Sequence, residues 1–220
     1  MRTKVVAGRW LVILAILLVL MTRPVAGQEL LNCLVASVDH VPVTAFDLEV
    51  VKTFDLLPGG DAVALAAEER LNRYIDLLLV LRLTREQLQV SQEEVRAELD
   101  RLREQLGPEV LEQRCRLLGL KPEDLTSYLQ DKILFEKVIG TRFNQRLYVS
   151  LKEIEDYYQQ VYVPEQKAAG RTPAELVTVL DEIEARLQAR RREERVKEWT
   201  GELRQRAEIV IYADCLSRIK

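Results

Sequence analysis

Residues 34–43 read LVASVDHVPV, and this stretch decides the predicted fold class. Its first five residues read as a short β-strand, DH as a turn, and the last three as a returning strand. The other strand-like run is EIVIY at residues 208–212. Because a lone hairpin is marginal in water, we expect residues 208–212 to pair with LVASV. The predicted fold class is therefore mainly α, with a small antiparallel β element formed by the N-terminal hairpin and the C-terminal strand.

The N-terminal segment has the three-part layout of a secretory signal peptide. Three basic residues precede the apolar run WLVILAILLVLM at residues 10–21, and Val25 and Gly27 suit a cut before Gln28. The run is shorter than the roughly 18 residues that a spanning helix needs. We expect residues 1–27 to be a signal peptide and the protein to be periplasmic, without stable membrane insertion after cleavage. An uncleaved membrane anchor is the alternative.

The composition suits a folded domain and argues against one class of partner. The chain has 220 residues, of which 48% are hydrophobic and 30% charged, enough for a sizeable core. Four of the 32 basic residues and none of the 35 acidic ones lie before Gln28, so 28 basic residues oppose 35 acidic ones after it, a net charge of −7. Nucleic acid requires a basic face that displaces counterions. We expect no nucleic-acid partner.

Helical patterns fill the region between the strands. Residues 62–87 are apolar nearly all round, which predicts a helix in the middle of a helical domain. A second long pattern runs from Pro173 to about Arg206 and has two apolar seams with a charged stretch, ARRREERVK at 189–197, between them. We interpret that stretch as a solvated helix face; a surface for an acidic partner is the alternative. Four N-cap patterns mark helix starts, at Thr44 with Asp47, Ser91 with Glu94, Ser150 with Glu153, and Thr172 with Glu175.

The segment VYVPEQKAAGRTPAE at residues 161–175 predicts a loop between two helices, because proline, glycine and small or charged residues fill its middle. The predicted organisation is a single domain over residues 28–220. Its parts are an N-terminal lobe at 28–163, a linker at 164–171, and the C-terminal long helix and strand at 172–213.

The chain has three cysteines, and in an exported protein an odd count suggests one bridge and one free thiol. If the terminal strands pair with Val38 opposite Val210, then Cys33 lies opposite Cys215. We therefore predict a Cys33–Cys215 disulfide, with two unpaired thiols as the alternative. Cys115 reads as an ordinary helix residue.

Residues that could carry catalysis are scarce. The only histidine is His40, in the predicted turn, and it lacks the partners that acid–base catalysis or a histidine metal site requires. No phosphate-binding glycine loop, nucleophile elbow or paired-cysteine spacing is present. We expect a protein that is not an enzyme and has no catalytic residues, metal site or cofactor.

Five segments, in order, resemble the SurA-type and PrsA-type extracytoplasmic folding factors. They begin with the opening hairpin and first helix and end with the helix and strand that return to the N-terminal lobe. The segments are VASVDHVPVTAFDLE (35–49), RYIDLLLVLRLTREQLQVSQEEVRAEL (73–99), LGLKPEDLTSYLQDKILFEKVI (118–139), VSLKEIEDYYQQ (149–160) and KEWTGELRQRAEIVIY (197–212). The resemblance covers nearly all of residues 34–212 and implies a SurA-like helical peptide-binding lobe.

The chain departs from this family at one place. In SurA-like proteins, parvulin prolyl-isomerase domains of about a hundred residues follow the EIEDYY-type helix. Here nine residues, PEQKAAGRT, occupy that position, and no histidine follows His40. The resemblance therefore implies the chaperone lobe without the isomerase: an ATP-independent holdase for unfolded exported or outer-membrane polypeptides. The alternative is a dedicated interaction subunit of a cell-envelope complex with one cognate partner.

Such a holdase needs an apolar groove with a polar rim. We predict leucines around the Gly107-Pro108 break on one side and tyrosines on the other, with a core position as the alternative for each. The candidates are Leu102, Leu106, Leu118, Tyr157, Tyr158 and Tyr162. The long helix behind its linker could also exchange into a second copy, which would give a homodimer.

Overall fold

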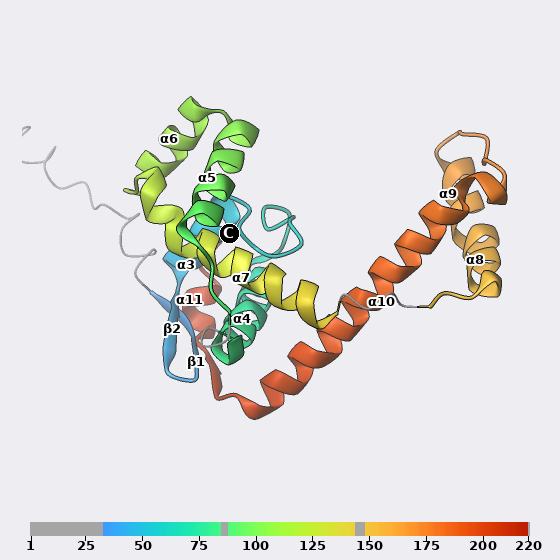
Figure 1. Cartoon of the computed structure of the whole chain (residues 1–220). Coiled ribbons are helices and arrows are strands. Elements are labelled where there is room, and N and C mark those ends of the chain that lie inside the picture. The colour runs from blue at the N-terminus through green and yellow to red at the C-terminus, as the bar shows by residue number, and fades with distance from the viewer. Residues whose placement is uncertain (1–32, 85–87, 144–147, 220) are drawn as a thin grey trace, which may run out of the picture.

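The computed structural model describes residues 33–84, 88–143 and 148–219. It is mainly helical with one three-stranded antiparallel sheet, which confirms the predicted fold class. The helices form two bodies joined by the long helix α10 (Leu176–Arg206), as Figure 1 shows. We call the larger one, which contains the sheet, the main body. We call the smaller one, which surrounds the N-terminal end of α10, the outer lobe.

The sheet joins the two ends of the described chain. Strands β1 (Leu34–Val38) and β2 (Val41–Thr44) form the predicted hairpin, and β3 (Ile209–Ile211) pairs with β1 on its other side. The hairpin turn residues Asp39 and His40 have φ angles of 47° and 71°. Positive φ at both turn positions matches the twist of a two-residue hairpin. The pairing of β1 with β3 confirms that the terminal strands pair as predicted.

The predicted register of that pairing is wrong by one residue. Val38 lies opposite Ile209, not Val210, and Ser37 lies opposite Val210. Two hydrogen bonds at the hairpin turn set this register. The Asp39 N–H donates to the Glu208 carbonyl over 2.8 Å, and the Glu208 N–H donates to Asp39 Oδ1 over 2.8 Å. Polar contacts at the turn thus select a register that apolar pairing alone left open.

The main body packs around the helix α4 (Ala67–Thr84), which is buried on several faces as predicted. Around it lie α3 (Ala45–Thr53), α5 (Gln92–Leu106), α6 (Pro108–Leu117), the 3₁₀ turn η1 (Pro122–Leu125), α7 (Thr126–Arg142) and the short α11 (Ala213–Leu216). Helix α7 packs against both α4 and α5. The capping boxes predicted at Thr44 and Ser91 are present, each closed by a backbone and a side-chain hydrogen bond.

Helix α4 begins five residues later than the sequence pattern predicts. The reason is that the buried side chain of Arg70 donates hydrogen bonds to backbone carbonyls just before the helix. Its Nε donates to the Ala62 carbonyl over 3.0 Å and its Nη2 to the Leu65 carbonyl over 2.6 Å. Arg70 is 1% exposed, and burial lowers its pKa. Those carbonyls bind the guanidinium, so residues 62–66 form a loop around it instead of the first turns of the helix.

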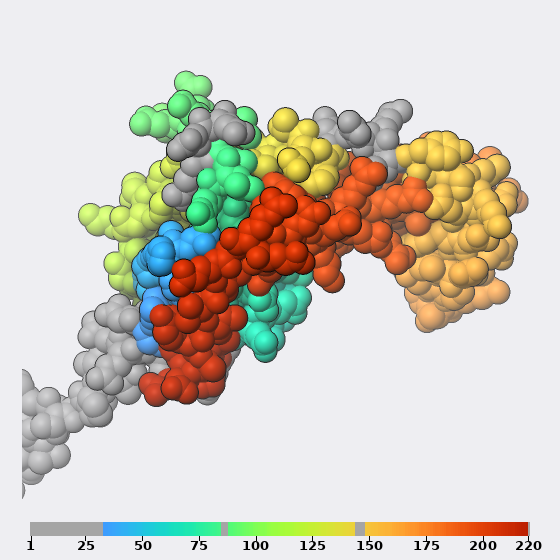
Figure 2. Space-filling view, turned by 90° about the horizontal axis from the view of Figure 1, so that it is seen from below, coloured from blue at the N-terminus to red at the C-terminus, as the bar shows by residue number. Residues whose placement is uncertain are grey.

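The outer lobe has a hydrophobic core of its own. Helix α8 (Leu151–Tyr157) continues through a π-helical turn, η2 (Tyr158–Tyr162), into α9 (Val163–Ala168), and all three pack on the first half of α10. In Figure 1 α8 and α9 stand at the far end of α10 from the sheet, and Figure 2 shows α10 crossing the main body toward them. The buried residues of this second core are Val149, Ile154, Tyr162, Val179 and Ile183.

The loop before α10 is shorter than predicted, and α10 starts later. Residues 164–168 of the predicted linker are helical and belong to α9. The π-helical turn η2 changes the pattern of backbone hydrogen bonds just before Pro164, and Pro164 has no N–H to donate, so the helix continues past it. The Thr172–Glu175 capping box is wrong: the N-cap of α10 is Glu175, without a side-chain bond. The Tyr158 hydroxyl donates to the Ala174 carbonyl over 2.8 Å and holds that residue against the outer lobe instead.

Candidate binding groove

A groove of about 750 Å³ lies where the ends of three helices meet. The C-terminal turns of α4, the second half of α7 and the last turns of α10 line it. Its floor is apolar and its rim is charged. The floor residues used below are Leu79, Val138, Trp199 and Leu203, and the exposed Leu83 lies at the edge.

An aromatic contact fixes the middle of the floor. Trp199 on α10 is 9% exposed, and its ring centroid lies 5.6 Å from that of Phe143, at the end of α7. The two rings are tilted by 60°, an edge-to-face type of arrangement that favours aromatic pairs. The guanidinium carbon of Arg142 lies 4.5 Å from the Trp199 ring centroid, within the range of a cation–π contact.

Two ion pairs hold the walls of the groove. Arg82 on α4 pairs with Asp39 of the hairpin turn, and Arg204 on α10 pairs with Asp76 on α4 over 2.5 Å. Burial raises the pKa of Asp76, and the hydrogen bond and charge of Arg204 oppose that rise. These contacts tie α10 and the hairpin to the same helix, so the groove has a stable frame.

The structure does not bring the six predicted lining residues together. Leu102 is buried in the core of the main body, and the half-buried Leu106 and Leu118 pack against that core. Tyr162 is buried in the core of the outer lobe, where Tyr157 and Tyr158 pack beside it. The single surface predicted from leucines and tyrosines is therefore wrong. The physical reason is that α10 separates the helices that carry the two sets (Figure 1).

Leu102, Tyr158 and Tyr162 have other local contacts. Leu102 also lines a smaller cavity of about 320 Å³ between α5, α7 and residues 54–60. Tyr158 and Tyr162 stack on each other, with ring centroids 5.6 Å apart and planes 19° apart. The tyrosines thus belong to the second core, which the sequence analysis did not predict. The apolar seam at Leu176, Leu180 and Ile183 was the sequence signal that could have predicted it.

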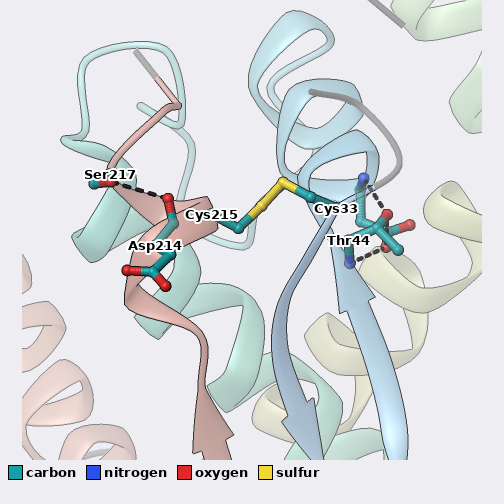
Figure 3. Close-up of a disulfide and its surroundings, with 6 residues drawn as sticks. Cys33, Thr44, Asp214, Cys215 and Ser217 are labelled. Atoms are coloured by element: carbon teal, nitrogen blue, oxygen red, sulfur yellow. Dashed lines mark hydrogen bonds between the residues drawn. A yellow bond between two sulfur atoms is a disulfide. The ribbon is translucent and has the colours of Figure 1, made fainter. Parts of the chain in front are cut away.

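The structure contains the predicted disulfide between Cys33 and Cys215 (Figure 3). Cys33 directly precedes β1, whereas Cys215 lies in the short helix α11. The third cysteine, Cys115, is free and 1% exposed. Burial raises the pKa of the Cys115 thiol, and the negative charges of nearby acidic residues, chiefly Asp124, raise it further. This thiol is therefore protonated at neutral pH and is a poor nucleophile.

His40 is a turn residue, as predicted, and its Nε2 lies 3.8 Å from Glu208 Oε2 in an exposed pair. Within the described ranges, no three His, Cys, Asp or Glu side chains gather in a way that could hold a metal ion. None of the described helices is both long enough and apolar enough to cross a membrane. Residues 1–27, where the signal peptide is predicted, lie outside the described residues.

Neither a scan against protein families nor a search of curated proteins returned a match. The groove must therefore be interpreted from its own chemistry.

Proposed function

We propose that this protein binds unfolded polypeptide segments without nucleotide and keeps them from aggregating in the periplasm. The observation that carries this proposal is the groove at α4, α7 and α10, with its apolar floor and charged rim. Such a surface shields apolar side chains, while the rim keeps the complex soluble. Apolar contacts of this kind require no single sequence in the ligand, which suits a binder of many sequences.

Two other features support the proposal. The Cys33–Cys215 disulfide is typical of proteins that work in an oxidising compartment, which agrees with export. The order of sequence segments resembles that of SurA-type chaperone lobes. In this proposal the nine residues 164–172 stand where those proteins have the isomerase domain, so binding proceeds without isomerase activity.

Aggregation suppression tests the proposal. An outer-membrane protein is diluted from urea with and without this protein, in the absence of nucleotide, and light scattering is followed. We expect suppression near stoichiometric ratios. Unchanged scattering at several-fold excess would reject the holdase function and favour a dedicated subunit with one cognate partner. Copurification with a single stoichiometric protein would then identify that partner.

A pair of variants ties the activity to the groove. Leu83 lines the groove and is 49% exposed, so Leu83→Glu adds charge there without disturbing the core. Leu117 on α6 is 78% exposed, and Leu117→Glu makes the same chemical change on another face. We expect Leu83→Glu to weaken suppression and Leu117→Glu to leave it unchanged. Equal effects would show that clients bind elsewhere.

Helix exchange between two copies stays a proposal. In the structure α10 packs on both bodies of its own chain, through Trp199 and Leu203 in the main body and Ile183 in the outer lobe. Size-exclusion chromatography with light scattering at increasing concentration distinguishes monomer from dimer.

A further inference from the structure

Among the described residues, the rim of the groove carries more positive than negative charge, although the chain as a whole is acidic. Of these residues, the arginines Arg82, Arg142 and Arg206 line it, against the acids Asp39 and Glu202. The formal net charge of the whole chain is −3. A local excess of arginine on an acidic protein suggests a ligand that carries negative charge.

Two of these arginines have no acidic partner among the described residues. Arg82 pairs with Asp39, but the structure shows no ion pair for Arg142 or Arg206. Elsewhere on α10, Arg186, Arg190, Arg191 and Arg204 each contact a carboxylate. Arg142 and Arg206 instead line the groove, where a bound ligand would meet them.

The Arg142 guanidinium is held against the floor of the groove. Its central carbon lies over the Trp199 ring, 4.5 Å from the ring centroid. A guanidinium can donate two parallel hydrogen bonds to one carboxylate. Because the cation–π contact already restrains the side chain, less conformational entropy is lost when a ligand binds.

We propose that the groove selects apolar polypeptide segments that carry a carboxylate. Apolar side chains of the segment contact Leu83, Trp199 and Leu203, while Arg142 and Arg206 bind the carboxylate. This inference rests on the proposed chaperone function and names the class of client that the groove prefers. The carboxylate can belong to an acidic side chain or to the C-terminus of the client.

Trp199 supplies a direct readout. Trp10 and Trp199 are the two tryptophans of the chain, so Trp10→Phe leaves Trp199 as the only one, whether or not the N-terminal segment is removed. Synthetic peptides of leucine, alanine and serine, free of aromatic residues and amidated at the C-terminus, are titrated while Trp199 fluorescence is recorded. The peptides differ only at one central position, which is Glu, Gln or Lys. A Gln peptide with a free C-terminus tests the terminal carboxylate.

We expect the Glu peptide to bind about fivefold more tightly than the Gln peptide and the Lys peptide to bind most weakly, the size expected for partly exposed ion pairs. Raising the salt concentration should reduce the difference, because salt screens such pairs. Arg206→Gln and Arg142→Gln should each reduce the Glu-to-Gln ratio. Arg192→Gln, an exposed arginine on the same helix, is the control with an equal charge change and should leave the ratio unchanged.

The outcomes separate this inference from the proposed function. Equal affinity for the Glu, Gln and Lys peptides, with aggregation still suppressed, would overturn the carboxylate preference and leave the chaperone function standing. Aggregation suppression without any Trp199 response would overturn the assignment to this groove. A preference that persists in both arginine variants would show that other charges select the ligand, and would also overturn the inference.

Discussion

Cys33 and Cys215 are bonded across 182 residues of sequence, although they do not face each other within the sheet. The pairing of β1 with β3 follows a register one residue away from the one that would align them. Cys215 instead lies in α11, which turns back toward β1 and brings the two Cα atoms to 6.1 Å. The bond closes the main body at the point where both ends of the described chain meet (Figure 3).

Reduction of this disulfide should destabilise the protein. From the loop entropy alone, a bridge that spans most of the chain contributes on the order of 5 kcal/mol. We expect Cys33→Ser with Cys215→Ser, or added reductant, to lower the free energy of unfolding, measured by urea titration, by a matching amount. The control is Cys115→Ala, which should keep its response to reductant. Three free thiols in the unreduced protein by mass spectrometry would contradict the bond.

Removing Arg204 should expose a conflict at Asp76. Arg204 Nη2 also donates to the Asn72 carbonyl over 2.6 Å, so the side chain joins α10 to α4 through two contacts. Without it, Asp76 stays partly buried with no counter-charge, and we expect Arg204→Ala to cost about 1–2 kcal/mol in urea unfolding at neutral pH. Arg192→Ala on the same helix is the control, and an equal loss there would contradict the prediction.

The Arg204→Ala loss should also depend on pH in a defined direction. Burial raises the folded-state pKa of Asp76, so it is the ionised form that the fold disfavours. The loss is therefore fully present well above that pKa and should shrink as falling pH protonates Asp76. A loss that stays constant down to pH 3 would show that Asp76 is not its cause.

Glu94 should show the opposite pH dependence. Hydrogen bonds from Lys137, at 2.7 Å, and from the Ser91 backbone lower its pKa from 4.5 to about 2. A lowered folded-state pKa gives stability that is present above pH 4.5 and is lost as pH falls toward 2. Glu94→Gln should therefore be less stable than the parent at pH 7 and equal to it near pH 2. Glu93→Gln, on the neighbouring residue, should show no such convergence.

The outer lobe should loosen without affecting the main body when Arg191 is removed. Its guanidinium contacts the Glu153 carboxylate and the Tyr148 carbonyl, which fixes the start of α8 to α10. Hydrogen bonds from Ser150, followed by the Arg191 charge, lower the pKa of Glu153. In Arg191→Ala we expect amide hydrogen exchange in residues 151–168 to accelerate by about two- to fivefold.

Exchange in α4 should stay unchanged in that variant, because α4 belongs to the other core. Arg192→Ala, the adjacent exposed position, is the matched control. Equal acceleration in both bodies would contradict the division into two separately stabilised cores.

Local chemistry allowed much of the secondary structure to be predicted from the sequence. The hairpin depends on the Asp39-His40 turn, and three helix starts depend on capping boxes that span only four residues, as at Ser150 with Glu153. Each signal lies within a few positions of the residue that it specifies. Partners so near in the chain meet whatever the rest of the fold does.

Contacts between distant residues decided the features that the sequence reading missed. The Tyr158–Ala174 hydrogen bond holds Ala174 outside α10, so the helix begins later than predicted. The Asp39–Glu208 hydrogen bonds set the register of the strands. The groove exists because Arg142 on α7 meets Trp199 on α10. Helical periodicity predicted that Trp199 lies on an apolar seam, but it contains no information on which helix covers that seam. Only the packing of several amphipathic faces against one another selects those partners.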